Sequence, residues 1–226
     1  MPGVSLRGVP QPREQIRNRK TKEGSRHPDR DTQFEHINAT VIKLQKAGQS
    51  VISANTKKKE LVGNFKNAGR EWRPEGTPEC VRVHNFLIPE KGKAVPYGVY
   101  DLTRNAGWVS MGIHHDTASF AVGTIRRWWR KMGRPAYPDA TPLMITADSG
   151  GSNSARSRLW KWALQRFAKR TGLLIVVCDS PPGTSKWNKI EHCLFSFITQ
   201  NWRGRPVTGL ATIISLIGST RTQTGL

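Results

Sequence analysis

A nearly continuous apolar run that ends in an aspartate most constrains how this chain can fold. Residues 143–147 read Leu-Met-Ile-Thr-Ala, Asp148 follows, and residues 149–153 form a glycine-containing turn. A short apolar run bounded by a turn is typical of a buried β-strand. Beyond the turn, apolar side chains recur at helical spacing, at Trp160, Ala163, Leu164, Phe167 and Ala168. This order predicts an α/β fold with Asp148 at the carboxyl end of a strand, where a hard metal ion or a phosphate can approach.

The remaining periodic segments predict a mixed sheet flanked by helices. Helical spacing is expected over residues 34–48, from 117 or 119 to 132, and over 190–198 and 210–217. Strands are expected over residues 51–55, 81–87, 98–102, 108–113 and 173–178. Strands that begin as a meander and then alternate with helices give a mixed sheet covered by helices. Ribonuclease-H-like folds have this layout, with carboxylates at the first strand, the fourth strand and a late helix, and other α/β layouts also fit the pattern.

The charge balance favours a polyanionic partner. The 226 residues contain 36 Lys and Arg against 16 Asp and Glu, a formal net charge of +20. Such an excess indicates nucleic acid rather than a membrane surface, and no apolar run reaches the roughly 18–20 residues that span a bilayer. The three cysteines, Cys80, Cys178 and Cys193, lack CxxC spacing. A disulfide framework is therefore not indicated, and the cytoplasm is the expected compartment.

A second acid stands where a helix is expected to begin. Glu191 precedes the apolar residues Leu194 and Ile198 by three and seven positions, which places it on or beside a buried face. A carboxylate there is costly unless it is paired or bound to metal. The alternative is a capping box, in which Asn188 caps the helix and Glu191 reaches back to it. For Asp148 the alternative is a turn or helix-capping residue.

Two other groups of residues allow different chemistry. His114, His115 and Asp116 are metal-ligand types, but adjacent histidines on a strand point to opposite faces, which disfavours a zinc site. Tryptophans can stack on bases, although most at helical spacing are expected in the core. They are Trp128, Trp129, Trp160, Trp162, Trp187 and Trp202.

Five blocks of sequence resemble the Rhodopirellula-type DDE transposases of bacterial insertion sequences. They are residues 56–67, 94–102, 147–153, 181–192 and 201–206. The resemblance runs from about Lys20 to Leu226. It implies a ribonuclease-H-like catalytic domain, Mg²⁺ or Mn²⁺ as cofactor, and the cutting and joining of double-stranded DNA at transposon ends and target. In this family Asp148 corresponds to the second catalytic carboxylate and Glu191 to the third.

The first carboxylate departs from the family pattern. The family has Val-Asp-Thr before a triple lysine, whereas this chain has Ala54, Asn55 and Thr56. An amide keeps an oxygen ligand but removes one negative charge, and it is a poor bridge between two cations. We therefore expect Asn55, Asp148 and Glu191 to form the catalytic and metal site, with strand cleavage and transfer impaired by Asn55. Asp101, on a neighbouring strand, is a possible substitute for the missing acid.

The resemblance and the charge also predict the organisation and partners of the chain. Residues 1–32 are expected to form a basic flexible arm, and residues 33–226 the catalytic domain, without the family's amino-terminal helix-turn-helix region and with a truncated carboxyl end. DNA contacts are predicted at Lys57, Lys58, Lys59, Arg156, Arg158, Lys186 and Lys189. A homo-oligomeric synaptic complex in the bacterial cytoplasm, associated with the nucleoid and not with a membrane, is expected.

Two alternatives remain at the level of sequence. One is a catalytically dead remnant that binds DNA with a steep salt dependence but has no metal-dependent turnover. The other is an unrelated metal-dependent nuclease that uses the pair His114 and His115.

Overall fold

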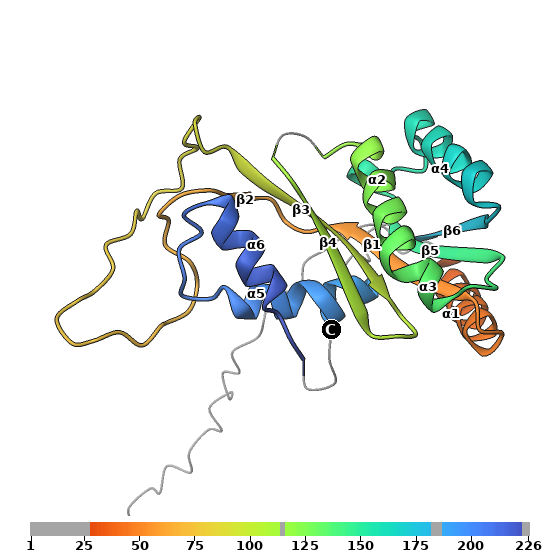
Figure 1. Ribbon diagram of the computed structural model, residues 1–226, viewed down its shortest axis with the longest axis horizontal. Coiled ribbons are helices and arrows are strands. Elements are labelled where there is room, and N and C mark those ends of the chain that lie inside the picture. The colour runs from red at the N-terminus through yellow and green to blue at the C-terminus, as the bar shows by residue number, and fades with distance from the viewer. Residues whose placement is uncertain (1–27, 114–115, 182–186, 223–226) are drawn as a thin grey trace, which may run out of the picture.

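One mixed β-sheet organises the chain (Figure 1). The computed structural model describes residues 28–113, 116–181 and 187–222. The strands found in this part are β1 (Ser50–Thr56), β2 (Glu60–Leu61), β3 (Lys93–Asp101), β4 (Ala106–Gly112), β5 (Pro142–Asp148) and β6 (Leu174–Ser180). Their order is β2-β3-β1-β5-β6, with β4 paired to β3. The strands β1, β5 and β6 are mutually parallel, whereas β3 is antiparallel to β1, β2 and β4.

Helices cover both faces of the sheet. On one face lie α2 (Ala118–Trp128), the π-helical turn η1 (Trp129–Gly133), α3 (Arg134–Ala136) and α4 (Arg158–Thr171). On the other lie the π-helical turn η4 (Glu191–Phe195), α5 (Ser196–Asn201) and α6 (Leu210–Gly218). Helix α1 (Arg30–Lys46) packs against β1 and β6. In Figure 1, α2 and α4 lie together at one end of the molecule and α5 and α6 lie toward the other.

The alternation of side chains along the strands divides the core into two clusters. Ile52 and Ala54 of β1 face the cluster beneath α2 and α4, which contains Trp128 and Trp160. The opposite cluster joins Tyr100 of β3 to the segment from η4 to α6. Because successive strand residues point to opposite faces, the intervening positions of β1 face η4.

Most of the predicted elements are confirmed. The helices expected from residue 34 and over 210–217 correspond to α1 and α6, the predicted hairpin to β3 and β4, and the apolar run before residue 148 to β5. The apolar face predicted for α4 is buried through Trp160, Leu164 and Phe167. Of the six tryptophans considered above, Trp162 and Trp187 are exposed and the others are buried.

The strand predicted over residues 81–87 is wrong. These residues belong to a long segment between β2 and β3 whose only described pairing is an isolated bridge between Phe65 and Arg82. Val83 and Phe86 are 73% and 76% exposed, so the apolar alternation has no sheet face to cover. The helix predicted to reach residue 132 also differs, because α2 ends at Trp128 and continues as η1.

In the described ranges, no helix is both long enough and apolar enough to cross a membrane.

Candidate active site

Three polar side chains from distant parts of the sequence meet at one edge of the sheet. Ser53 lies opposite Thr146 in the parallel register of β1 and β5. Two residues further along, Asn55 and Asp148 therefore lie on the same face, near the carboxyl ends of their strands. The turn η4 packs on that face and carries Glu191. Strand register and helix packing thus assemble the three residues that the sequence singles out.

The amide of Asn55 bridges the two carboxylates. Its Nδ2 donates to Asp148 Oδ2 at 3.2 Å and to Glu191 Oε1 at 3.1 Å. Asn55 is only 7% exposed, so these hydrogen bonds form largely away from solvent. The amide nitrogen occupies the space between the two acids.

The surrounding hydrogen bonds fix the orientation of this amide. Asn55 Oδ1 accepts from the backbone N–H of Thr56 at 2.8 Å. It also accepts from Asn153 Nδ2 at 3.4 Å. A backbone N–H can only donate, so the amide oxygen must face Thr56, and the NH₂ group must face the carboxylates. Turning Oδ1 toward the acids would break the Thr56 hydrogen bond and bring oxygen against oxygen.

Buried contacts from β1 and β3 hold η4 close to the sheet. Ser53 Oγ donates to Asn188 Oδ1 and accepts from the backbone N–H of Ile190 at 3.3 Å. On β3, a Cβ at Gly98 would lie 2.5 Å from the ring of Phe195, so glycine permits this close approach. The capping box considered as the alternative for Glu191 does not form, because Glu191 Oε1 accepts from Asn55 and no side chain caps the turn.

Asp148 likewise does not cap the following helix. The side chain of Ser157 caps α4 by accepting from the backbone N–H of Trp160. Asp148 instead ends β5 with its side chain at the site. Neither acid therefore caps a helix, and the carboxylate of Asp148 is shared between Asn55 and the backbone N–H of Gly150 in the turn that follows.

A second layer of polar residues, which the sequence did not reveal, supports the site. Asn153, fully buried in the short helical turn η2 (Gly151–Asn153), donates to the carbonyl of Ala54 at 3.2 Å and accepts from Tyr97 Oη at 2.7 Å. Thr56 Oγ1 donates to Asp116 at 2.9 Å and contacts Ser152 Oγ at 3.2 Å. Asn153 lies within one of the resembling blocks, but nothing in its spacing indicates this role.

Burial raises the pKa of both carboxyl groups. For Asp148, loss of solvation outweighs the hydrogen bond from Asn55, which acts in the opposite direction. For Glu191, burial and the negative charge of Asp148 raise the pKa, while Asn55 and the ammonium of Lys57 lower it. The site therefore disfavours two negative charges unless a further positive charge is added.

Asp148 and Glu191 supply oxygen ligands suited to one divalent cation, which would have to displace the Asn55 amide nitrogen that lies between them. Asp148 Oδ1 is buried and has no hydrogen-bond partner among the described residues. Buried polar atoms normally have a partner, so this oxygen is available to bind a cation. Carboxylate oxygens are also the ligands that Mg²⁺ and Mn²⁺ prefer. Asn55 does not fit as a third ligand, because it presents N–H groups to the site. Within the described residues, His, Cys, Asp and Glu side chains form no group of three or more that could hold a metal ion.

Asp101 does not replace the missing acid. It lies opposite Ile52, three residues before Asn55 on β1 and therefore about 10 Å from it along the strand. Its carboxylate is engaged by Tyr137 Oη at 2.9 and 3.0 Å and by the backbone N–H groups of Thr103 and Arg104. Asp101 therefore ties β3 to its own hairpin turn and to Tyr137.

The residues predicted to contact DNA are in different environments. Lys58, Lys59, Arg156, Arg158 and Lys189 are exposed. Lys57 is buried, with its Nζ 3.4 Å from Glu60 Oε1 and 4.2 Å from the centre of the Trp202 ring. Burial lowers the pKa of Lys57, and Glu60 opposes this effect. Lys186 lies outside the described residues, as do His114 and His115 of the alternative metal site.

The strand order and the helices on both faces of the sheet define a ribonuclease-H-like fold, and solved structures of transposases agree on this fold. The chain is similar to the Mos1 mariner transposase in its paired end complex with Mn, with a TM-score of 0.57 and 12% identity over 91% of this chain and 58% of that one. It is similar to a pre-cleavage Mos1 transpososome with a TM-score of 0.54 and 12% identity, over 90% and 59% of the two chains. The chain thus matches less than two thirds of the length of these Mos1 chains.

A match to a sequence model identifies the family of this chain. The model of the Rhodopirellula transposase DDE domain matches residues 14–226, and the chain belongs to this family. Comparison with curated protein sequences gives no match. The ribonuclease-H-like fold and the family expected from the sequence are both confirmed.

Proposed function

We propose that this chain is the catalytic domain of a bacterial insertion-sequence transposase whose activity is reduced by Asn55. The family membership supports cleavage and joining of double-stranded DNA at transposon ends. The observation that carries the reduced activity is the amide of Asn55, which donates to both Asp148 and Glu191. The same two carboxylates are the groups that would hold a divalent cation.

The chemistry depends on how these side chains share charge. Mg²⁺ or Mn²⁺ held by Asp148 and Glu191 would supply activation of an attacking oxygen and stabilisation of a leaving one. Asn55 contributes no negative charge and donates hydrogen bonds to the oxygens that the cation needs. It therefore competes with the cation and leaves the site with two carboxylates in place of three.

The DNA partner is supported by charge and by likeness. The net charge of +20 favours phosphate binding, and exposed basic residues such as Lys58, Lys59 and Arg156 lie on segments that flank the site. The similar Mos1 structures are a paired end complex and a transpososome. By analogy we propose a homo-oligomeric synaptic complex on transposon and target DNA, at the bacterial nucleoid.

Reversion of the first acid tests the proposal. Purified wild-type and Asn55→Asp chains are incubated with Mn²⁺ and labelled duplexes that carry candidate terminal repeats from the DNA beside the gene. Even groups outside the metal shell change affinity or activity by about 10–100-fold, so restoring a ligand should raise cleavage by about 100-fold or more. The control is Asn55→Asp combined with Glu191→Gln, which should remain inactive.

Two outcomes would contradict the proposal. Equal cleavage by wild type and Asn55→Asp would show that the amide does not limit activity. No cleavage by Asn55→Asp, on duplexes that the chain demonstrably binds, would show that more than this one residue separates the chain from an active enzyme.

A further inference from the structure

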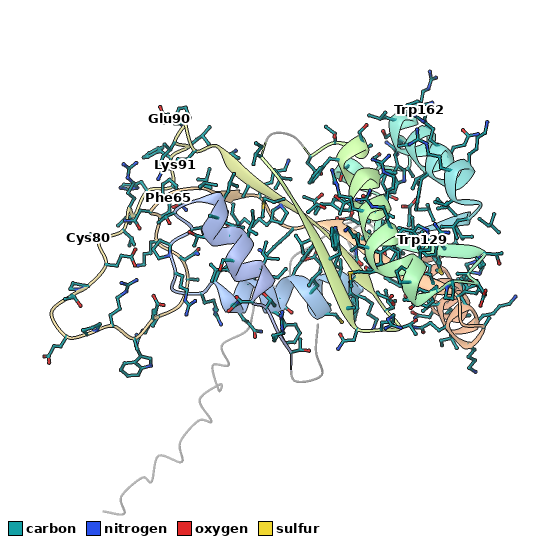
Figure 2. The ribbon with its side chains drawn as sticks, viewed as in Figure 1. Phe65, Cys80, Glu90, Lys91, Trp129 and Trp162 are labelled. Atoms are coloured by element: carbon teal, nitrogen blue, oxygen red, sulfur yellow. The ribbon has the colours of Figure 1, made fainter. Side chains whose placement is uncertain are left out.

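A basic groove lies between α2 and α4, outside the candidate active site. It is lined by Arg126 and Gly123 of α2 and by Trp162, Arg166 and Arg170 of α4. Figure 2 labels Trp162 on α4 beside α2, and 52% of its surface is exposed. All three arginines are exposed as well. The groove is therefore an open surface with charged and aromatic walls.

The charge of this groove is not neutralised by neighbouring acids. Neither α2, η1 nor α4 contains an Asp or a Glu. Across the described ranges, no carboxylate lies within ion-pair distance of Arg126, Arg166 or Arg170. By contrast, α1 balances its basic residues with Asp31 and Glu35. The three arginines of the groove therefore have no counter-charge among the described residues.

The side chains of α4 are arranged in a line. Trp162, Arg166 and Arg170 are spaced four residues apart and therefore share one face of the helix, spanning about 12 Å. The Arg166 guanidinium lies 4.6 Å from the centre of the Trp162 ring, an interaction that orders the charge before a ligand arrives. Duplex DNA carries one phosphate charge per about 1.7 Å of its axis, so a duplex along this line presents several phosphates.

The groove begins close to the site. Ser119, at one end of it, lies two residues after Thr117, the N-cap of α2. Asp116, next to Thr117, accepts a hydrogen bond from Thr56, the neighbour of Asn55. The groove lies on the face of the sheet opposite η4, so a duplex that reaches the active site at the sheet edge would extend past the start of α2 onto this surface.

We propose that the groove between α2 and α4 binds the phosphate backbone of double-stranded DNA that flanks the reacting position. Arg126, Arg166 and Arg170 contact phosphates irrespective of base sequence, and Trp162 holds Arg166 in place. The inference rests on the proposed function only in taking DNA as the substrate. It requires no metal and no catalytic turnover.

Binding of a 30-base-pair duplex of arbitrary sequence, measured by fluorescence anisotropy in EDTA from about 50 to 200 mM salt, tests the groove. Arg166→Gln combined with Arg170→Gln should raise Kd roughly tenfold at 150 mM salt and reduce the slope of log K against log salt by about 2. The matched control, Lys43→Gln combined with Lys46→Gln on α1, removes the same charge from exposed positions elsewhere. It should change Kd by less than about twofold.

A second pair of variants leaves the arginines intact. A Cβ at Gly123 would meet only the Arg127 guanidinium, at 3.8 Å, so the first atom of a new side chain causes no clash there. Gly123→Glu should weaken duplex binding about tenfold more than Gly123→Gln, since the two differ only in charge. Equal effects of groove and control variants would overturn the groove proposal while DNA binding by the wild type stands. Failure of the wild type to bind duplex at all would overturn the proposed function as well.

Discussion

The amide of Asn55 donates hydrogen bonds to two carboxylates that lie close together. Two buried carboxylates repel each other, and each needs a hydrogen-bond donor or a positive charge. The Asn55 amide provides donors to Asp148 and Glu191 simultaneously, and Lys57 adds a positive charge that favours ionised Glu191. On the proposed function, a cation at this site has to compete with these hydrogen bonds.

Neutralising Glu191 should therefore stabilise the chain. Glu191→Gln keeps an oxygen that accepts from Asn55 and removes a charge whose burial is unfavourable. We expect the Tm at pH 7 without divalent metal to rise by roughly 2–4 °C, the shift that about 1 kcal/mol gives in a domain of this size. Thermal unfolding followed by circular dichroism measures it, with Glu35→Gln on exposed α1 as the control.

The same variant has a defined pH dependence. The pKa of Glu191 is raised in the folded chain, so the folded state is favoured by protonation. This contribution is present below the unfolded pKa and is lost as pH rises through the raised folded pKa. The advantage of Glu191→Gln should thus be largest near neutral pH and shrink on acidification below the folded pKa. A gain that grows on acidification would contradict the pKa shift.

At the scale of elements, the position of η4 determines where Glu191 lies. A π-helical turn places Glu191 at the start of a helix that continues into α5, and such turns are frequent at functional sites. The close approach of Phe195 to Gly98 leaves no room for a side chain on β3. The absence of a Cβ at Gly98 therefore allows η4 to lie this close to the sheet.

Gly98→Ala should force η4 away from β3. Overpacking of this kind costs about 1–3 kcal/mol, and the displacement should also weaken the hydrogen bond between Asn55 and Glu191. Urea unfolding measures the cost. Gly218→Ala at the end of α6 is the matched control, because nothing lies within 4 Å of its added Cβ. Equal stability of the two variants would mean that η4 adjusts without strain.

Sequence reasoning succeeded where the signal is local. The strand ending at Asp148 and the buried face of α4 follow from periodicity. The resemblance to the transposase family indicated Glu191 as the second acid beside Asp148. Sequence reasoning failed for the orientation of Asn55, which depends on Asn153 and the backbone of Thr56, contacts that only the folded chain brings together. It also failed for residues 81–87, because alternation alone does not show whether a sheet is present to receive the side chains.

At the scale of the whole molecule, one sheet joins the two apolar clusters. Trp128 and Trp160 lie on one side of it and Trp202 on the other. Neither cluster can lose its strands without exposing the other, so the described part of the chain should unfold cooperatively.

Coincident transitions test this expectation. Urea unfolding followed by tryptophan fluorescence and by far-ultraviolet circular dichroism should give the same midpoint. Trp202→Phe, which removes the reporter in the second cluster, should leave the two probes in agreement. Separate midpoints would show that the region from η4 to α6 unfolds independently of the cluster beneath α2.

The bridging amide of Asn55 also has a consequence for inheritance. Asparagine and aspartate codons differ only in their first base, so a single transition converts one side chain into the other. The amide gives both acids a hydrogen-bond donor in the folded chain, so the substitution leaves neither of them without a partner. Every copy then lies one base change away from the three-carboxylate form.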